Sequence, residues 1–206
     1  MPVHLVRHPL IEDVLAGLRD RATTPAEFRR LARRLSLVLI AEATRELGLV
    51  EATVMTPLEK ATVKRLAPRV VAVPVLRAGL GMLDAFLELL PQAEVGYFGL
   101  ERNEETAVAR RYYEKVPRDL ARAVVYLLDP MLATGGSAAM AIDGLLGLGA
   151  RDIRLLTIVA APEGIAHLAA TCPGVVIHTA ALDRGLNDRK YILPGLGDFG
   201  DRLFST

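Results

Sequence analysis

The chain is short of cysteine. Its 206 residues include one, Cys172, which cannot form an internal disulfide bond and has no cysteine or histidine neighbour at the spacing of a metal site. A lone thiol is typical of proteins that work in reducing compartments. The sequence therefore predicts a cytoplasmic protein without a disulfide framework.

Long hydrophobic runs are missing as well. Although 51% of the residues are hydrophobic, the densest runs, such as residues 35–41, are far shorter than the roughly 20 residues that cross a bilayer. Residues 1–8 contain neither the apolar segment nor the small-residue cleavage site of a signal peptide. We therefore expect no membrane association.

An excess of charge is also absent. The 25 basic and 24 acidic residues give a formal net charge of +1, so no strong field indicates binding to nucleic acid or to anionic membranes, which weakens any RNA-binding interpretation. The chain has no tryptophan and few aromatic residues, a composition that suits an α/β core with some apolar surface left for another subunit. A length of 206 residues fits a single domain over residues 1–206.

The most informative stretch that is present runs from residue 123 to residue 149. An apolar run predicts a buried strand, which is followed by a loop with Gly135 and Gly136 and then by a helical pattern. The first amides of a helix lack internal partners and lie at the positive end of its dipole, so they bind anions. Thr134 and Ser137 add hydroxyl donors, and Asp129 at the strand end suits a sugar hydroxyl. We therefore predict a ligand that contains phosphate and ribose.

Two common phosphate-binding motifs do not fit these residues. A Walker A loop needs a lysine before its serine or threonine, whereas Gly136 is followed directly by Ser137. A dinucleotide fingerprint that began at Gly79 and Gly81 would need a third glycine at position 84, which is Asp84. Neither a nucleoside triphosphatase nor a Rossmann oxidoreductase is indicated.

The loop does resemble a known family. The run from Asp129 to Ser137 is similar to the phosphoribosyl diphosphate (PRPP) loop of type I phosphoribosyltransferases. Its particular sequence, Asp-Pro-Met-Leu-Ala-Thr-Gly-Gly, is similar to that of the uracil phosphoribosyltransferases. Most of the superfamily has a second acidic residue where this chain has Pro130. That difference implies that diol and metal contacts are made elsewhere.

A second strand and loop precede the first. The β-branched run 70–76 predicts a strand, and Arg77 follows it beside Gly79 and Gly81, before a helix that closes at Pro91. An arginine at such a position has the forked donors that hold a diphosphate. Composition alone favours a surface arginine near a turn, but the run 73–81 resembles the diphosphate loop of the family, which implies that Arg77 binds PRPP.

The region after residue 93 carries a third strand, predicted over residues 93–100, and then a polar stretch to Pro117. The resemblance implies that this stretch is a flexible hairpin over the site and that Arg102 contacts PRPP. Without the resemblance, a solvated charged loop is the simpler interpretation of the residues after Glu104. The cluster 110–113 could also stack bases, but four residues without a basic surround are weak evidence for nucleic acid.

The remaining elements predict the fold class. The motif Thr24-Pro25-Ala26-Glu27 is a capping box that starts a helix ending at Gly48, and a shorter helix precedes it. Strands over 153–159 and 175–180 flank a helix that begins at Pro162. This βα alternation predicts an α/β protein with a mostly parallel sheet flanked by helices and with ligands outside the carboxyl ends of the strands. The histidines have no partners for a metal site or a catalytic triad, and His178 reads as a core or edge histidine.

The tail, residues 183–206, contains a turn at 187–190 and too much glycine for a helix. For an arbitrary chain it would be an inert C-terminal loop. Here it resembles the base-binding hood of uracil phosphoribosyltransferases.

The resemblance as a whole implies the type I phosphoribosyltransferase fold and an enzyme that joins uracil to PRPP, giving UMP and diphosphate. It also implies that Mg²⁺ is bound through PRPP and water, with Asp198 as a candidate for contact with metal-bound water. It implies PRPP binding by Arg77, Arg102, Asp129, Pro130, Met131, Leu132, Ala133, Thr134, Gly135, Gly136, Ser137 and Asp198. It implies uracil binding by Ile192, Gly197, Asp198 and Phe199. Arg102, Asp129 and Asp198 are the residues that it places closest to the reaction.

GTP as an allosteric effector and assembly as a homo-oligomer are further implications of the resemblance. Two alternatives stay open at this point: an RNA-binding regulator of pyrimidine genes on the same fold, and a phosphoribosyltransferase for another base such as hypoxanthine or orotate.

Overall fold

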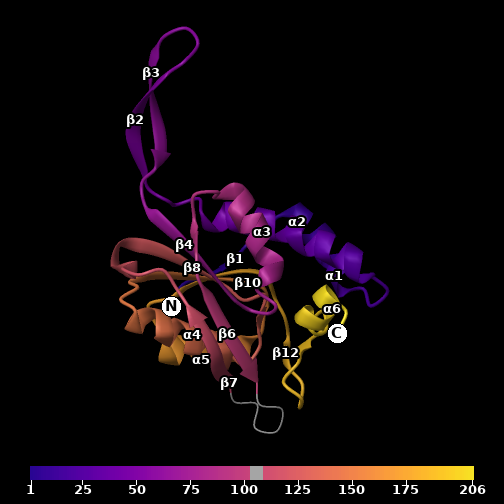
Figure 1. The fold of residues 1–206 in the computed structure, drawn as a ribbon. Helices are drawn as coiled ribbons and strands as arrows, with labels where there is room; N and C mark the ends of the chain where they lie inside the picture. The colour runs from indigo at the N-terminus through magenta and orange to yellow at the C-terminus, as the bar shows by residue number, and fades with distance from the viewer. Residues whose placement is uncertain (103–108) are drawn as a thin grey trace.

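A single large sheet organises the molecule (Figure 1). The structure is a computed structural model that describes residues 1–102 and 109–206, without side chains at positions 101, 102 and 109. Its strand order is β1-β11-β10-β8-β4-β6-β7, with β5 beside β4 and β9 beside β10. The strands are β1 (Val3–Leu5), β4 (Arg69–Leu76), β5 (Glu94–Val95), β6 (Tyr97–Arg102), β7 (Ala109–Lys115), β8 (Ala123–Leu128), β9 (Met131–Leu132), β10 (Asp152–Ala160) and β11 (Val176–Leu182). All neighbours in this sheet are parallel except β6 and β7, so the predicted mostly parallel sheet is confirmed.

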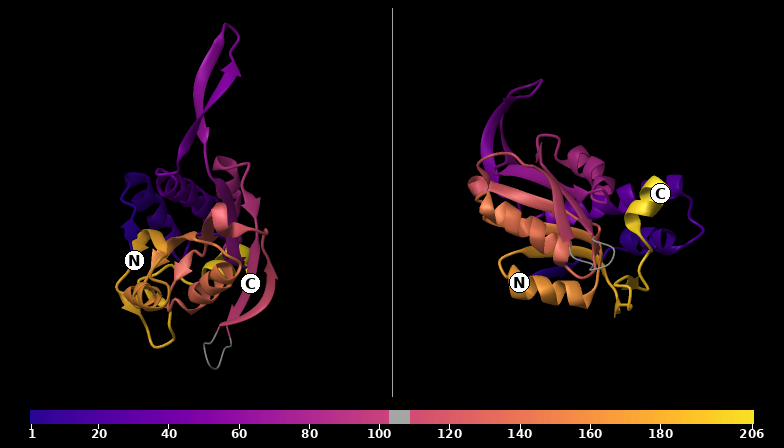
Figure 2. Two further views of the ribbon diagram at one scale, coloured as in Figure 1. Left: turned by 90° about the vertical axis from the view of Figure 1, so that its left-hand side faces the viewer. Right: turned by 60° about the horizontal axis from the view of Figure 1, so that its bottom comes forward.

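Helices cover both faces of the sheet. On one side lie α1 (Pro9–Arg19), α2 (Pro25–Ala43) and α3 (Leu80–Leu89), and on the other lie α4 (Gly136–Gly147) and α5 (Pro162–Thr171) (Figure 2). Alternate residues of a strand enter different cores: Val71 and Val73 of β4 pack with α4, whereas Val70 and Ala72 pack with α2 and α3. Burial on both faces explains why these strands are continuous hydrophobic runs. A 3₁₀ turn, η1 (Leu120–Arg122), leads into β8.

The start of α2 confirms half of the predicted capping box. Thr24 Oγ1 accepts a hydrogen bond from the Glu27 amide at 3.3 Å, and Pro25 occupies the first helical position. The Glu27 carboxylate does not return to the cap; it forms an ion pair with Arg30. The reciprocal bond is lost because an arginine one turn ahead on the exposed face is the stronger partner for a carboxylate.

The predicted end of α2 at Gly48 is wrong. The helix ends at Ala43, where the Thr44 hydroxyl donates to the Ile40 carbonyl at 2.8 Å. The chain then turns, with the Leu47 amide bonded to the Thr44 carbonyl at 3.0 Å, and Leu47 is buried. Burial of that leucine in the core requires the turn that a continued helix would prevent.

A hairpin that the sequence analysis did not identify follows α2. Strands β2 (Leu49–Met55) and β3 (Lys60–Leu66) pair antiparallel with each other and join no other strand of the described chain. They project away from the body of the molecule (Figure 1). Alternating residues at 50, 52 and 54 and at 61 and 63, with Pro57 at the turn, were the signal for it.

The predicted third strand is broken at Gly96 into β5 and β6, and the Gly96 amide bonds to the Ala72 carbonyl at 2.9 Å. The polar stretch that follows is strand β7, so the loop interpretation is wrong for residues 109–115 and a hairpin is confirmed. The pairing of β6 with β7 is irregular at Tyr112, and a Cβ at Gly99 would lie 2.6 Å from the Tyr112 ring and 2.8 Å from Tyr113 Cβ, so both tyrosines lie beside the same glycine. The tip of the hairpin, residues 103–108, lies outside the described residues.

The C-terminal segment is built from β12 (Gly185–Leu186), β13 (Ile192–Leu193) and α6 (Phe199–Phe204). The expectation that this segment forms no helix is wrong for its end. Asp198 caps α6 by accepting from the Asp201 amide at 2.9 Å, and Phe199 and Leu203 are buried in the core shared with α2. A good cap and two buried apolar residues one turn apart outweigh the cost of Gly200. Within the described residues, no helix is long and apolar enough to cross a membrane.

Candidate active site

Three segments meet at a cavity of about 250 Å³ at the carboxyl ends of β4 and β8. They are the loop after β4, the loop between β8 and α4, and the start of α6, so segments far apart in sequence form one site, at the position expected for a parallel sheet. The cavity is lined by Val75, Leu76, Arg77, Ala78, Leu100, Asp129, Met131, Leu132, Ala133, Thr134, Gly135, Ser137, Ala138 and Asp198.

The loop before α4 has the geometry of an anion cradle. Gly135 is the N-cap of α4 with φ +83°, a left-handed conformation that glycine adopts without strain. A Cβ at Gly135 would also lie 3.0 Å from the Gly164 carbonyl oxygen, at the start of α5. Gly136 begins the helix and has only Thr134 Oγ1 within 4 Å of such a Cβ. Glycine is therefore required at 135 by conformation and packing, whereas position 136 is open.

Asp129 and Pro130 have different places in this loop. Asp129 is 9% exposed and lines the cavity, and its Oδ1 accepts from the Met131 amide at 3.5 Å. Pro130 is buried outside the lining, and its carbonyl accepts from the amides of Ile158 and Val159 at 3.0 and 3.1 Å. Pro130 thus ties the loop to β10, and its side chain does not reach the cavity. Any contact of Pro130 with a ligand would be indirect.

Arg77 lines the cavity and leans on α6. Its guanidinium is 3.7 Å from the Asp201 carboxylate and lies over the Phe204 ring, 5.8 Å from the centroid. Both charged side chains are about half exposed, so the ion pair is weak and leaves the arginine free to turn to another anion at little cost. Gly79 is needed behind it, because a Cβ there would lie 2.4 Å from the Leu128 carbonyl oxygen. The Leu76–Arg77 and Leu193–Pro194 peptide bonds are cis.

Arg102 is the last residue of β6, next to β4, and its side chain lies outside the described residues. Its backbone pairs with that of Ala109. Leu100, two residues earlier on the same strand, lines the cavity, so β6 reaches the site.

The segment 183–206, which we call the hood, contributes Asp198 to the cavity. Gly197 precedes it with φ +82°, and no hydrogen bond of the described chain engages the N–H or C=O of Gly197. Ile192 is buried in β13. The Phe199 ring points into the core, with its centroid 5.1 Å from that of Phe28. A contact of Phe199 with a base would therefore have to come from its backbone.

An ion pair that the sequence analysis missed holds the hood to α1. Arg19 donates to both carboxylate oxygens of Asp183, at 2.8 and 2.6 Å, and to the Gly195 carbonyl at 2.7 Å. Asp183 in turn accepts from the Gly195 amide at 2.8 Å. The signal was an aspartate at the end of a buried strand, but its partner lies 164 residues away and no spacing rule identifies it.

Arg202 forms a second anchor. It donates to the Leu196 carbonyl at 2.8 Å and to the Asp20 carbonyl at 2.6 Å, and it stacks over the Phe28 ring at 4.4 Å. Burial lowers the pKa of this guanidinium from its ordinary value, although an arginine remains charged at neutral pH. Both anchors converge on residues 195 and 196, which immediately precede Gly197.

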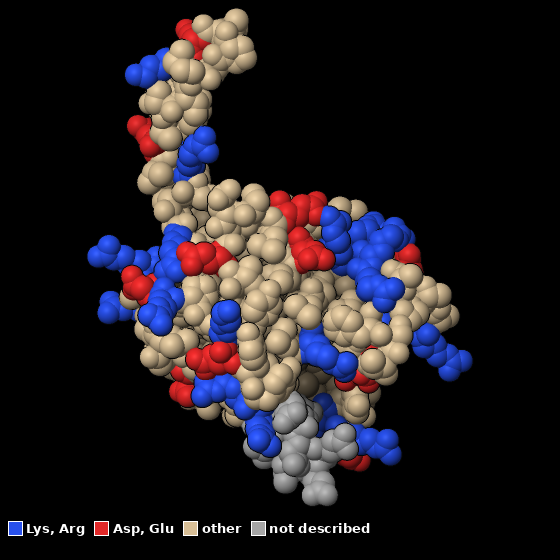
Figure 3. All heavy atoms as spheres, in the orientation of Figure 1, with Lys and Arg blue, Asp and Glu red and all other residues tan. Residues whose placement is uncertain are grey.

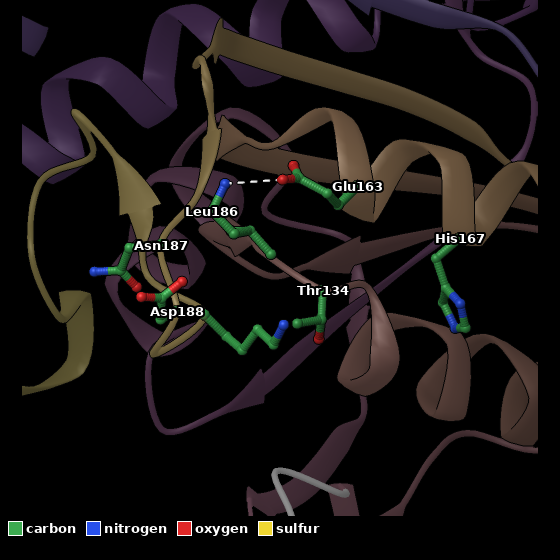
Figure 4. A pocket seen from close by; sticks show the side chains of 7 residues that line it. Thr134, Glu163, His167, Leu186, Asn187 and Asp188 are labelled. Atoms are coloured by element: carbon green, nitrogen blue, oxygen red, sulfur yellow. Dashed lines mark hydrogen bonds between the residues drawn. The ribbon is translucent and has the colours of Figure 1, made fainter.

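A second cavity, of about 410 Å³, lies between the hood and α5 (Figure 4). Thr134 lines both cavities. Glu163 of α5 accepts from the Leu186 amide at 2.9 Å, and this bond, with the positive charge of Lys190, lowers the pKa of the Glu163 carboxyl. The rest of the lining is His167, Asn187 and Asp188. This cavity therefore joins the hood loop to the outer side of the phosphate cradle.

His178 is half-buried on β11, beside the edge strand β1, as expected of a core or edge histidine. His178 stacks on His4 with ring centroids 4.8 Å apart, and burial lowers the pKa of His178 to about 4, helped by the charges of His4 and Arg154. Within the described residues, no group of three or more histidine, cysteine, aspartate or glutamate side chains could hold a metal ion. Two acidic residues of the described chain line the ligand cavity: Asp129 from the loop after β8 and Asp198 from the hood.

Comparison with known proteins gives consistent matches. The family model described as uracil phosphoribosyltransferase matches residues 5–206. The chain is 46% identical over 204 residues to the uracil phosphoribosyltransferase of Campylobacter concisus, covering 99% of this chain and 98% of the relative. It is 48% identical over 205 residues to that of Staphylococcus epidermidis, with the same coverage.

Solved structures give the same picture of the fold. A protein of Aquifex aeolicus superposes with a TM-score of 0.95 at 36% identity, covering 99% of this chain and 98% of that one. The adenine phosphoribosyltransferase of Thermoanaerobacter pseudethanolicus matches with a TM-score of 0.51 at 14% identity, covering 77% of this chain and 84% of that one, a likeness of fold alone.

Proposed function

The chain belongs to the uracil phosphoribosyltransferase family and transfers the phosphoribosyl group of PRPP to uracil, giving UMP and diphosphate; from this premise we propose which of its residues carry out each part. One observation carries the proposal. The loop at Arg77, the loop at residues 129–137 and the hood residue Asp198 line the same cavity. A substrate with phosphate at both ends of a ribose and a base beside it matches these three segments. None of the findings favours an RNA-binding regulator or another base.

The phosphate loop would hold the 5′-phosphate of PRPP. The amides at the start of α4, with the hydroxyls of Thr134 and Ser137, converge on this position and favour a negative charge. Asp129 would accept hydrogen bonds from the ribose hydroxyls. Pro130 would act only by tying the loop to β10, because its carbonyl is engaged there.

Arg77 and Arg102 would bind the diphosphate. The N1–C1′ bond to uracil forms as the bond from C1′ to diphosphate breaks, and the uracil N1 proton is released, for which we assign no general base. Charge therefore builds up on the departing diphosphate. Fixed cations at that end lower the barrier because they are already oriented when the charge develops. The half-exposed pair of Arg77 with Asp201 is weak, so Arg77 can exchange it for the diphosphate when PRPP binds, before charge develops.

Magnesium would enter with PRPP rather than occupy a site of its own. The described residues offer no three-carboxylate or histidine cluster, but Mg²⁺ typically keeps several waters and one or two carboxylates beside substrate phosphates. Asp129 and Asp198, which both line the cavity, fit that role through water. The ion would supply charge neutralisation on the diphosphate.

The hood would read uracil through its backbone. Uracil presents an acceptor, a donor and an acceptor along one edge, which peptide N–H and C=O groups can match. Gly197 supports this role, since its backbone groups make no hydrogen bond within the described chain while those of Gly195 and the Leu196 carbonyl are taken by the anchors. Ile192 and Phe199 would contribute by their backbones, and Asp198 would steady charge near the reacting base.

A second copy of the chain is the partner that we propose for the β2–β3 hairpin. Its large apolar residues are exposed, and Figure 3 shows wide uncharged stretches between the few basic and acidic side chains of the hairpin. These residues are Leu49, Val50, Met55, Leu58 and Leu66. Exposed apolar surface of this kind is typical of subunit contacts. Sedimentation of Leu58→Asp should show a smaller assembly than wild type.

The single-domain organisation, a cytoplasmic location and activation by GTP remain part of the same proposal. Cys172 is a free, buried thiol, which supports a reducing compartment. The GTP effector rests on the family resemblance alone.

The assay that tests the function is PRPP-dependent nucleotide formation with uracil, hypoxanthine and orotate, with and without Mg²⁺. We expect UMP from uracil only, and little product without the metal. Product from hypoxanthine or orotate at a rate comparable with uracil would refute the assignment of the base.

A further inference from the structure

Lys190 has an unusual backbone conformation. Its φ is +64°, in the left-handed region that costs an L-residue free energy and that glycine occupies without strain. The turn imposes this conformation: the Lys190 amide bonds to the Asn187 carbonyl at 2.8 Å, and Asn187 Oδ1 accepts from the amides of Arg189 and Tyr191 at 3.0 and 2.9 Å. A lysine therefore stands where a glycine would be more stable. Strain of this kind is typical of residues whose side chain has a function.

The Lys190 side chain lines the cavity of about 410 Å³ between the hood and α5. Thr134 of the phosphate loop lines the same cavity, with Glu163 and His167 on its α5 side (Figure 4). His167 lies directly behind Gly135, since a Cβ on that glycine would be 3.1 Å from His167 Cδ2. The cavity therefore adjoins the phosphate cradle at Thr134, which lines both.

The cradle itself lacks a cation. Residues 129–137 contain no lysine or arginine, so a 5′-phosphate there would meet only amides, hydroxyls and the helix dipole. Among the described residues that line the two cavities, Arg77 is the one arginine and Lys190 the one lysine. Arg77 comes from the loop after β4, which we assign to the diphosphate. Lys190 is the cation on the side of Thr134.

We propose that Lys190 is a binding residue for the 5′-phosphate of PRPP and of UMP, supplied by the hood across Thr134. The inference rests on the proposed position of the phosphate cradle. It adds a cationic partner from a segment that also reads the base, so the two ends of UMP are held by one element. The left-handed conformation of Lys190 lowers the stability of the fold, and on this proposal it is retained because it places the lysine beside the cradle.

The test compares two ligands that share only the 5′-phosphate end. UMP carries that phosphate and no diphosphate, whereas PRPP carries both. Lys190→Met should raise the Kd of UMP, measured by calorimetry, and the KM of PRPP about five- to tenfold, as expected for one charge-assisted contact near solvent. The KM of uracil should stay within twofold. Arg77→Ala should instead raise the KM of PRPP and leave the Kd of UMP nearly unchanged.

Two further variants separate binding from structure. Arg189→Met removes a neighbouring exposed cation of the same turn that does not line the cavity, and it should bind UMP like wild type. Lys190→Gly should weaken UMP binding as much as Lys190→Met, yet raise the Tm because the backbone strain is relieved.

The inference is overturned if Lys190→Met and Arg189→Met bind UMP equally well. A Lys190→Met enzyme with a lower Tm but wild-type UMP affinity would make the lysine only a counter-charge for Glu163 and would overturn it too. Failure of the cradle itself has a different signature: Gly136→Val would then bind UMP like wild type, whatever Lys190 does.

Discussion

Replacing Arg19 by methionine tests whether the hood is held in its reading position by the ion pair with Asp183. The pair is short, bidentate and nearly buried, with side-chain exposures of 25% for Arg19 and 6% for Asp183. Arg19 also donates to the Gly195 carbonyl at 2.7 Å. Methionine keeps much of the apolar stem and removes all three bonds. Asp183 is then left with the Gly195 amide as its remaining partner in this network.

The magnitude follows from burial. Removing one partner of a buried ion pair costs about 3 to 5 kcal/mol, because the remaining charge stays unpaired in a poorly solvated site. A quarter of the Arg19 side chain is exposed, so water can partly replace it, and we expect about 2 to 4 kcal/mol. The cost should appear first as local opening of the hood, since global unfolding breaks many other contacts. At 1.4 kcal/mol per factor of ten, opening becomes about 30- to 700-fold more frequent.

Hydrogen exchange and steady-state kinetics both measure this opening of the hood. The Gly195 amide, which donates to Asp183, should exchange faster by that factor in Arg19→Met, and the KM of uracil should rise more than that of PRPP. Arg30→Met is the matched control. Its ion pair with Glu27 is on the surface, with exposures of 61% and 39%, and its loss should change stability by less than about 0.5 kcal/mol. If Arg19→Met keeps wild-type exchange at Gly195 and a wild-type KM for uracil, the ion pair does not position the hood.

Three further predictions concern the phosphate ends and the pH dependence of stability. Arg77→Ala should weaken the use of PRPP at least tenfold, since it removes charge-assisted bonds of roughly 1.5 to 3 kcal/mol each; unchanged kinetics for PRPP would remove Arg77 from the site. Gly136→Val should abolish activity with little loss of Tm, because among the described residues beyond its chain neighbours and its own helix backbone only Thr134 Oγ1 lies within 4 Å of a Cβ there; wild-type activity would mean that the cradle is misplaced. His178, whose pKa is lowered to about 4, is neutral in the folded state while the unfolded chain takes up a proton near pH 6.5, so its contribution is present above pH 6.5 and is lost as the pH falls towards 4. Urea midpoints of wild type and His178→Gln should converge over this range on acidification, and parallel curves would contradict the assignment.

The sequence predicted the elements whose signals are local. Strands β4, β8, β10 and β11 are buried on both faces and are therefore apolar runs in the sequence. The loop before α4 was recognisable because its left-handed N-cap requires a glycine, Gly135. The hairpin β2–β3 was missed because it is exposed and only half apolar, so its alternation is weak. Helix α6 was missed because the surrounding glycines argue against a helix, whereas the helix is stabilised by the packing of Phe199 and Leu203 in the core.

The candidate site also contains residues that could be predicted from the sequence and contacts that could not. Arg77, Asp129, the residues from Met131 to Gly135, Ser137 and Asp198 line one cavity. All but Asp198 follow parallel strands, whereas Asp198 was named through the family resemblance alone. The contacts that hold the hood could not be predicted, because Arg19 and Asp183 are joined by the tertiary fold alone. The same holds for Lys190, which lines one cavity with Thr134 of the phosphate loop and lies in a turn whose conformation no composition rule indicates.

The central claim is that the hood selects uracil by its backbone. In cytosine an amino group replaces one carbonyl oxygen, so a backbone N–H would face a donor, and each buried unpaired donor costs roughly 1 to 3 kcal/mol, with far larger discrimination where a site is built around the bond. 5-Fluorouracil keeps the edge of uracil and adds little volume. The most direct measurement is therefore kcat/KM for uracil, 5-fluorouracil and cytosine at saturating PRPP and Mg²⁺. We predict similar values for the first two and a value for cytosine at least about 100-fold lower, whereas comparable values for cytosine and uracil would contradict the claim.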